Sequence, residues 1–170
     1  MNLIEQIRNA GVIGAGGAGF PTHAKLASEA EYILMNGAEC EPLLRVDQQL
    51  MALYPDEIIK GFEMAGRAVN AQHAIIGIKK KHDKVIALLR ERIQALGLAD
   101  FVEVKELADV YPAGDEQVLV HELTGRVVPE AGIPIAVGCV VVNSETAFNI
   151  YKASQGQPVT EKYITIAGDV

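Results

Sequence analysis

Glycine is concentrated in one short segment of the sequence, GAGGAGFP, which begins at Gly14. Four glycines within six residues remove the Cβ atoms that keep ligands away from a backbone, and they permit positive φ angles. Consecutive N–H groups of such a loop can surround an anion or lie against a planar ring. Pro21 and Thr22 are suited to begin a helix whose positive end attracts phosphate, and Lys25 adds a point charge. The segment therefore predicts a site for a phosphorylated ligand rather than a flexible turn.

The same glycines also satisfy the dinucleotide pattern G-x-G-x-x-G at Gly14, Gly16 and Gly19, with Glu39 lying 20 residues further on. An ordinary NAD-dependent dehydrogenase is therefore one alternative. That pattern needs a strand directly before it and a helix that opens at the third glycine. Here a helical segment precedes the loop and Phe20 with Pro21 follows it, so the context disfavours this alternative. No G-x-x-x-x-G-K-[ST] segment occurs, which excludes a P-loop.

The elements that must position this loop alternate regularly along the chain. Apolar runs or period-2 patterns predict strands, and apolar residues at helical spacing predict helices. Strands are expected over residues 32–35, 73–78, 101–104, 135–142 and 163–167. Helices are expected over residues 3–10, 22–28, 47–54, 55–69, 83–96, 115–124 and 145–153. This alternation predicts an α/β fold, a Rossmann-like three-layer domain with a largely parallel, twisted sheet.

The composition limits the classes of partner and compartment. Apolar residues make up 49% of the 170-residue chain and charged residues 22%, which is typical of a packed globular domain. The net charge of −7 argues against nucleic acid and against anionic membrane surfaces as partners. No apolar run reaches the ~20 residues of a membrane-spanning helix, and the first residues lack the pattern of a signal peptide. We therefore predict a cytoplasmic protein without direct membrane insertion.

The sequence contains no pattern for metal binding or for a side-chain nucleophile. Cys40 and Cys139 form no C-x-x-C and have no histidine at metal-ligand spacing, so neither zinc nor an iron–sulfur cluster is expected within this sequence. Cys40 is interpreted as a small buried residue rather than a redox thiol. No Ser-His-Asp or Cys-His arrangement is present. We therefore expect no metal site and no catalytic side chain.

Four motifs together resemble the family of RnfC and the 51-kDa flavoprotein subunit of complex I. GAGGAGFPTHAKL is similar to the GRGGAGFP-T-x-x-K-W motif of the 51-kDa subunit and closer to the RnfC form. NGAECEPLLRVD resembles the family segment N-G-A-E-C-E-P, and YPAGDEQ resembles the Y-P-x-G-x-E stretch of the cobalamin reductase branch. VVVNSET resembles N-N-V-E-T. The motifs occur in the family order, and together they span most of the chain, from Gly14 to Thr146.

The resemblance implies that FMN binds in a cleft at the strand ends, with NADH stacked over its ring. It implies that the glycines of the loop line the flavin and its phosphate, that Lys25 lies near the phosphate, and that Phe20 contacts the nicotinamide nucleotide. The other side chains implied to bind the cofactor are those of Asn36, Glu39, Glu41, Asp115, Glu116, Asn143 and Thr146. The full set of backbone positions implied is Gly14, Gly16, Gly17, Gly19 and Gly114. The hydride transfer would then belong to the cofactor.

Several of these residues also have simpler interpretations. Outside the four motifs, Glu39 and Glu41 would be solvated loop acids, whereas beside a flavin they would lower its reduction potential. Asp115 and Glu116 would also suit the first turn of a helix, and that role is compatible with cofactor binding. These alternatives remain open on the sequence alone.

Two positions depart from the family pattern. Val142 replaces the first asparagine of N-N-V-E-T, and Ala15 replaces the arginine of G-R-G-G. Both changes bear on how tightly a cofactor would bind. They keep open a second function, that of a docking scaffold with the same fold and without catalysis.

The resemblance implies an FMN-dependent NADH dehydrogenase domain of the cobalamin reductase type, formed by residues 1–170 at the N-terminal part of a longer protein. The SLBB and 4Fe-4S domains of that protein are absent from this sequence. Electrons would pass from NADH through flavin to iron–sulfur clusters and then to cob(III/II)alamin. A corrinoid adenosyltransferase or another electron-transfer subunit would be a partner, and the cytoplasm or a bacterial microcompartment would be the location. The alternative is an RnfC-type subunit of a membrane ferredoxin:NAD oxidoreductase.

Overall fold

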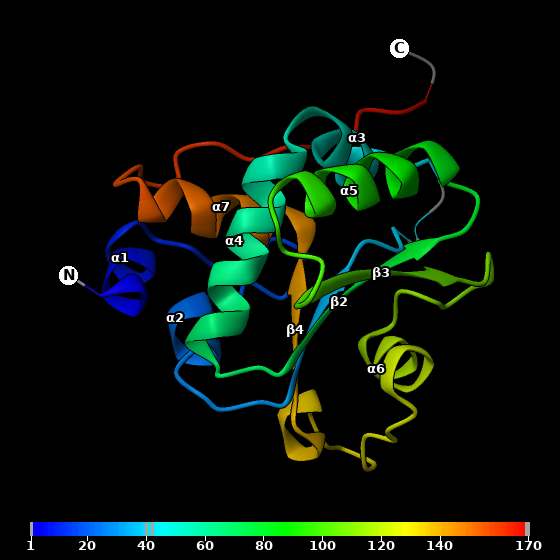
Figure 1. The fold of residues 1–170 in the computed structure, drawn as a ribbon, viewed down its shortest axis with the longest axis horizontal. Helices are drawn as coiled ribbons and strands as arrows, with labels where there is room; N and C mark the ends of the chain where they lie inside the picture. The colour runs from blue at the N-terminus through cyan, green and yellow to red at the C-terminus, as the bar shows by residue number, and fades with distance from the viewer. Residues whose placement is uncertain (1, 40, 42, 169–170) are drawn as a thin grey trace.

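Four parallel strands form one sheet in the computed structural model, which describes residues 2–39, 41 and 43–168 (Figure 1). The order of the strands across the sheet is β3-β2-β1-β4. Their bounds are Tyr32–Asn36 for β1, His73–Lys79 for β2, Val102–Leu107 for β3 and Cys139–Asn143 for β4. The predicted α/β fold with a parallel sheet is therefore confirmed.

The chain changes direction across the sheet between β1 and β4. From β1 it proceeds to β2 and then β3, and it afterwards returns past both to place β4 on the other side of β1. Right-handed crossovers that run in opposite directions place their helices on opposite faces. In sheets of this kind, ligands bind in the crevice beyond the carboxyl ends of the two strands at which the order reverses. The topology thus marks the ends of β1 and β4 as the place for a site.

Helices cover both faces of the sheet, as the three-layer prediction requires. One face is covered by α4 (Pro55–Ala68), α5 (Asp83–Ala95) and α7 (Ser144–Ser154), whereas α6 (Glu116–Thr124) lies on the other face (Figure 1). The sequence produces the two layers because successive side chains of a strand point to opposite faces. In β1, Ile33 and Met35 belong to the larger apolar cluster under α4, and Leu34 belongs to the smaller cluster under α6.

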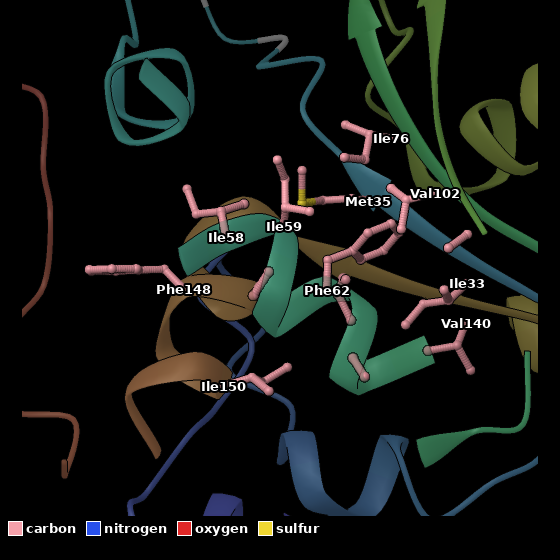
Figure 2. Close-up of a cluster of buried hydrophobic side chains, with 14 of the residues drawn as sticks. Ile33, Met35, Ile58, Ile59, Phe62, Ile76, Val102, Val140, Phe148 and Ile150 are labelled. Carbon is pink, nitrogen blue, oxygen red and sulfur yellow. The ribbon is translucent and has the colours of Figure 1, made fainter. Parts of the chain in front are cut away.

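The larger cluster fills the space between the sheet and α4 and α7. Figure 2 shows Phe62 of α4 among side chains of the strands, with Ile58 and Ile59 one turn earlier. All three side chains are completely buried. Gly61 lies between them, where a Cβ atom would come within 1.9 Å of the Ala147 carbonyl oxygen. Glycine at this position therefore lets the backbones of α4 and α7 approach closely, which fixes α7 against the core.

Local signals explain where the helices begin and end. Asn2 and Glu5 form a capping box at the start of α1 (Leu3–Asn9). Pro55 occupies the first turn of α4, and Gly125 ends α6 with a left-handed φ of 74°.

The remaining helices are α2 (Thr22–Lys25) and α3 (Val46–Leu53). No described helix has the length and apolar character needed to cross a membrane.

Two strand predictions are wrong in part or in whole. The apolar run 135–142 contains a 3₁₀ helix, η1 (Pro134–Val137), and only its later residues enter β4. Gly138, with a φ of 71°, separates the two elements. Residues 163–167 form no strand. The backbone of this segment bonds to a side chain instead of to a neighbouring strand: Tyr163 N–H donates to the Glu145 carboxylate at 3.2 Å.

Candidate functional site

Two adjoining cavities open at the carboxyl ends of β1 and β4. Their volumes are about 260 Å³ and about 590 Å³. Both are lined by Gly16, Asn36, Gly114 and Asn143, which therefore form the boundary between them. Asn36 and Asn143 end the two strands, and Gly114 follows β3 in the loop before α6. The cavities thus lie where the reversal of strand order predicts a ligand.

The smaller cavity lies between the glycine loop, α2 and the end of β4. Besides the shared residues, its lining includes Gly14, Ala18, Phe20, Thr22, Lys25, Glu116, Val141, Val142 and Thr146. The larger cavity lies between the glycine loop, the start of α3 and the C-terminal segment. Its lining includes Ala15, Gly17, Glu39, Glu41, Leu44, Val46, Asp47, Glu145, Lys162, Tyr163, Ile164 and Thr165. The first cavity therefore contains one lysine and one carboxylate beside bare backbone, and the second contains four carboxylates and one lysine.

The glycine loop is a hairpin closed by its own backbone. Gly14 N–H donates to the Phe20 carbonyl at 2.8 Å, and Gly19 N–H donates to the Gly14 carbonyl at 3.2 Å. No strand precedes the loop, since α1 ends at Asn9 and only Ile13 forms an isolated bridge, with Pro21. The standard dinucleotide geometry is therefore absent, as the sequence context indicated.

Three consecutive N–H groups at the tip of this loop are unused by the protein. Ala15 N–H donates to Thr146 Oγ1 at 2.9 Å, but the N–H groups of Gly16, Gly17 and Ala18 have no hydrogen-bond partner among the described residues. Gly17 has a φ of 121°, which side-chain-bearing residues rarely adopt. Adjacent unpaired N–H groups with such backbone angles form a concavity that suits an anion.

Lys25 provides the positive charge of the smaller cavity. Its Nζ donates to the Val141 carbonyl at 2.9 Å, lies 3.8 Å from Glu116 Oε1 and lies 6.0 Å from the centre of the Phe20 ring. An ammonium group carries three donors, so these contacts hold its position and leave capacity for a ligand oxygen. The Phe20 ring is 51% exposed at the rim of the cavity, where it can contact a bound nucleotide.

The two asparagines brace the loops around the cavities. Asn36 Nδ2 donates to the Gly114 carbonyl at 2.8 Å, and its Oδ1 accepts from Ala38 N–H at 3.2 Å. Asn143 Oδ1 caps α7 by accepting from Glu145 N–H at 2.9 Å, and its Nδ2 donates to Asp47 Oδ1 at 2.9 Å. Each amide therefore joins two segments that line the site.

Two of the predicted acids cap helices. The Glu39 carboxylate accepts from Asp47 N–H at 3.1 Å and from Gln48 N–H at 3.4 Å at the start of α3. Asp115 caps α6 by accepting from Gln117 N–H at 3.0 Å. The helical interpretation of Asp115 thus holds, and Glu39 is a partly buried cap rather than a solvated acid. Glu41 is exposed at the edge of the larger cavity.

Burial of neighbouring carboxylates disfavours their charged forms. Desolvation raises the pKa of Glu39, and the nearby Asp47 charge raises it further. Desolvation also raises the pKa of Asp47, while hydrogen bonds from Ser144 and Asn143 oppose that effect. Glu39 and Asp47 form an acidic wall of the larger cavity beside α3, and a further negative charge placed next to them would be unfavourable.

Lys162 pairs with Glu145, another of the four carboxylates that line the larger cavity. Its Nζ makes a salt bridge with Glu145 at the start of α7 and donates to the Ala15 carbonyl of the glycine loop at 3.1 Å. The Glu145 side chain is only 3% exposed, so protein groups rather than bulk water must satisfy its carboxylate oxygens.

The structure brings together nearly all the residues that the sequence predicted. Of those 14 positions, Gly19 and Asp115 do not line either cavity; Gly19 closes the loop hairpin and Asp115 caps α6. Asp47, Glu145 and Lys162 were missed. The Asp47 and Lys162 contacts join segments 96 and 147 residues apart, respectively. Asp47 ends the motif NGAECEPLLRVD and Glu145 lies within VVVNSET, so motif membership could have identified both, whereas no quoted motif contains Lys162.

Clusters of metal-ligating side chains or exposed thiols in the described residues would offer a different chemistry. No group of three histidine, cysteine, aspartate or glutamate side chains that could hold a metal ion occurs in residues 2–39, 41 and 43–168. Cys139 is buried in β4, and burial raises the pKa of its thiol. Cys40 lies outside the described residues.

Comparisons with known proteins identify the family and several relatives of this chain. The family model of the "Nuo51 FMN-binding domain" matches residues 7–152. Cobalamin reductase PduS of Citrobacter freundii is 45% identical over 167 residues, which are 98% of this chain and 36% of that protein. One subunit of the Na(+)-translocating ferredoxin:NAD(+) oxidoreductase complex of Acetobacterium woodii is 37% identical over 171 residues, covering 97% of this chain and 38% of that protein.

A solved structure supports the fold. In the crystal structure of the NAD⁺-reducing [NiFe]-hydrogenase in the air-oxidized state, one chain matches with a TM-score of 0.78 and 27% identity. The match covers 89% of this chain and 30% of that chain. Our chain therefore spans little more than a third of the curated relatives and less than a third of the structural one.

Proposed function

This chain belongs to the family of the Nuo51 FMN-binding domain, and from that premise we propose that it is the NADH-oxidising flavin domain of an electron-transfer enzyme. The observation that supports this most is the run of unpaired N–H groups at Gly16, Gly17 and Ala18. Gly16 and Ala18 line the smaller cavity together with Lys25, and Gly17 lines the adjoining larger cavity. Such a run beside a lysine matches a phosphate group. It lies at the crevice that the sheet topology marks for ligands.

The residues present fit FMN. A phosphate placed at the loop would receive backbone N–H donors and the Lys25 ammonium. The absence of side chains at Gly14 and Gly16 leaves space for a planar ring to approach the backbone, because a Cβ at Gly16 would occupy the gap beside Asn143 at 3.6 Å. Thr146, whose hydroxyl already accepts from Ala15 N–H, would remain able to donate to a ligand oxygen.

When bound, FMN would supply the hydride and electron chemistry, and the chain would supply orientation. The glycine loop holds one side of the site, and the Asn36–Gly114 hydrogen bond fixes the loop on the other side. Phe20, at the rim of the smaller cavity, would contact the nicotinamide nucleotide. The larger cavity adjoins the smaller one across Gly16 and Asn143, so a nucleotide in it would reach the ring.

The acidic wall would tune the bound cofactor. Glu39, Glu41 and Asp47 line the larger cavity, and negative charge near a flavin opposes the addition of electrons. We therefore expect a low reduction potential, which suits a donor to iron–sulfur clusters. No side chain of the chain is needed as a nucleophile.

The onward path of electrons is proposed from the relatives. The chain spans only 36% of the PduS proteins, so its iron–sulfur module would lie in further domains of a longer protein. Cobalamin reduction is favoured because the more identical curated relatives bear that name. The alternative is a role as an RnfC-type subunit within an ion-translocating ferredoxin:NAD(+) oxidoreductase. In either case we place the domain in the cytoplasm or in a bacterial microcompartment, with an electron-transfer subunit or a corrinoid adenosyltransferase as partner.

The test is to reconstitute the purified chain with FMN and to measure NADH oxidation with an artificial electron acceptor. We expect stoichiometric yellow protein, a saturable dependence of the rate on NADH, and a much weaker response to NADPH. Omission of FMN is the control and should abolish turnover. Failure to bind FMN would contradict the proposal, whereas FMN binding without NADH oxidation would retain the flavin site and reject the donor.

A docking scaffold with the same fold is the second candidate function. The observation that favours it is the internal pairing of Asn36 and Asn143, whose amides are both already bonded within the protein. Val142 adds to this, because it is buried in the larger apolar cluster where the family motif carries an asparagine. Under this hypothesis the chain should fold stably and bind no flavin, so the flavin content separates the two functions.

A further inference from the structure

The chain after α7 lies across the site as an extended segment, residues 157–168, which we name the C-terminal strap. Val159 N–H donates to the Ala10 carbonyl at 2.9 Å, and Glu161 pairs with Lys152 of α7 at 3.2 Å. Further on, Thr165 Oγ1 accepts from Arg45 N–H at 3.1 Å, at the start of α3. The strap therefore extends from α1 past α7 to α3, and four of its residues line the larger cavity.

Lys162 is the point at which the strap contacts the glycine loop. Its side chain is 56% exposed, yet its Nζ joins the buried Glu145 carboxylate to the Ala15 carbonyl. The other Glu145 oxygen accepts from Tyr163 N–H at 3.2 Å, so the strap satisfies both oxygens of this carboxylate. A buried carboxylate without such partners would be strongly destabilising.

Ala15 is held on both of its backbone groups. Its N–H donates to Thr146 Oγ1 of α7, and its carbonyl accepts from Lys162. A trans peptide directs its carbonyl and its N–H in opposite directions. The bond to Lys162 therefore sets the orientation of the Ala15–Gly16 peptide, and with it the direction of the unpaired Gly16 N–H.

We propose that Lys162 is a positioning residue that orders the tip of the glycine loop by joining the Ala15 carbonyl to the buried Glu145 carboxylate. The strap would then prepare the loop for an anionic ligand before the ligand arrives. The effect on the loop stands on contacts within the chain alone, whereas its consequence for FMN affinity rests on the proposed function. Two separate measurements keep these claims apart.

Hydrogen–deuterium exchange of the flavin-free chain tests the ordering. We expect Lys162→Met to speed exchange of the paired amides of Gly14, Ala15 and Gly19 at least about tenfold, which corresponds to ~1.4 kcal/mol of lost local stability. Lys162→Met with Glu145→Gln removes both charges and keeps an acceptor for Tyr163 N–H. Compared with Lys162→Met, this double variant should be more stable to heat, because it leaves no unpaired buried charge. Its loop amides should still exchange fast, because the bond to the Ala15 carbonyl is missing. Lys162→Arg, which keeps a cation, should restore most of the protection.

Lys152→Met is the matched control, because Lys152 also pairs α7 with the strap but has no contact with the glycine loop. It should leave exchange in residues 12–20 unchanged. Unchanged exchange in Lys162→Met and in the double variant would overturn the proposal. An equal effect of Lys152→Met would also overturn it, because it would indicate a general loosening of the strap.

FMN titration of the same variants gives the second measurement. The double variant should bind FMN about tenfold more weakly than the natural chain, which is ~1.4 kcal/mol, and Lys152→Met should bind it normally. If the natural chain binds no FMN, the proposed function fails while the exchange data still decide the role of Lys162. If the double variant showed fast exchange but unchanged FMN affinity, the strap would order the loop without preparing it for FMN.

Discussion

Asn36 and Asn143 are register partners at the carboxyl ends of β1 and β4, and each uses its amide to tie a loop of the site to the sheet. Asn36 holds Gly114, and Asn143 holds both the first turn of α7 and Asp47 of α3. Two neighbouring strands thus end in the same residue type, with donor and acceptor groups that organise the site around them.

Replacing Asn143 by alanine should destabilise the fold. The change removes the cap of α7, worth about 1 kcal/mol, and leaves Asp47 without one donor, worth roughly 1–3 kcal/mol more. We expect a loss of at least about 2 kcal/mol in the free energy of unfolding, measured by urea denaturation. Asn2→Ala, which removes the exposed cap of α1, is the control and should cost less than half as much. Equal losses would show that Asn143 acts only as a cap.

Replacing Gly16 by valine should prevent FMN binding without unfolding the chain. A Cβ at Gly16 meets Asn143 at an ordinary contact distance of 3.6 Å, so the branched side chain would extend into the cavities rather than clash with the core. We expect the dissociation constant for FMN to rise at least tenfold, or ~1.4 kcal/mol, by fluorescence titration.

Gly16 is a cleaner test than Gly17. Gly17→Val should also abolish FMN binding, but its φ of 121° would strain any side-chain-bearing residue and so confound the result. Ala99→Val, at an exposed turn away from the site, is the control for added volume. Normal FMN affinity in Gly16→Val would show that the cofactor does not use this loop.

Replacing Lys25 by methionine should weaken FMN more than riboflavin. Only FMN carries the phosphate that the Lys25 ammonium would contact, and a charge-assisted bond of ~1.5–3 kcal/mol corresponds to a tenfold to hundredfold change in affinity. Parallel titrations with the two flavins give the ratio. Lys84→Met, at an exposed position of α5, controls for loss of one positive charge. Equal losses for both flavins would remove Lys25 from phosphate binding.

Replacing Asp47 by asparagine should change how stability depends on pH. Burial raises the pKa of Asp47 above its ordinary value of 3.8. A carboxyl whose pKa rises on folding makes the folded state less stable as pH rises from the unfolded pKa through the folded pKa. The variant should therefore melt about 2 °C or more above the natural chain at pH 7, with the gain vanishing at a pH below the ordinary value.

The control for Asp47 is Asp100→Asn, since Asp100 is exposed in the turn before β3. This substitution should leave the melting temperature nearly unchanged across the same pH range. A gain for Asp47→Asn that is constant with pH would mean that packing, and not the charge of the carboxylate, explains the stabilisation.

Much of the fold follows from local pattern. The compact apolar run 73–78 and the apolar spacing in 83–96 predict β2 and α5 to within two residues. The run suits a strand that is buried on both faces, and the spacing suits a helix that buries one face. The run 135–142 misleads because its continuous apolar character masks Gly138, where the chain turns from η1 into β4. The 163–167 segment misleads because its bonding partners are groups of α7 and of the start of α3 rather than another strand.

The residues of the site also divide into those that the sequence can predict and those that it cannot. The glycine loop, Asn36 and Asn143 can be predicted because motif and strand end coincide at each of them. The contacts of Asp47 and Lys162 cannot be predicted, because they arise only when distant segments meet around the cavity. Glu39 shows a third case: its position was predicted, but its engagement as the cap of α3 depends on a fold-level contact.

The passage from β4 into α7 has no intervening loop, since Asn143 is both the last residue of the strand and the cap of the helix. An α-helix rotates by about 100° per residue. One inserted residue at this junction would therefore swing Glu145 and Thr146 away from the glycine loop and break two of its anchors at once. Relatives of this chain should therefore differ in length at places other than this junction.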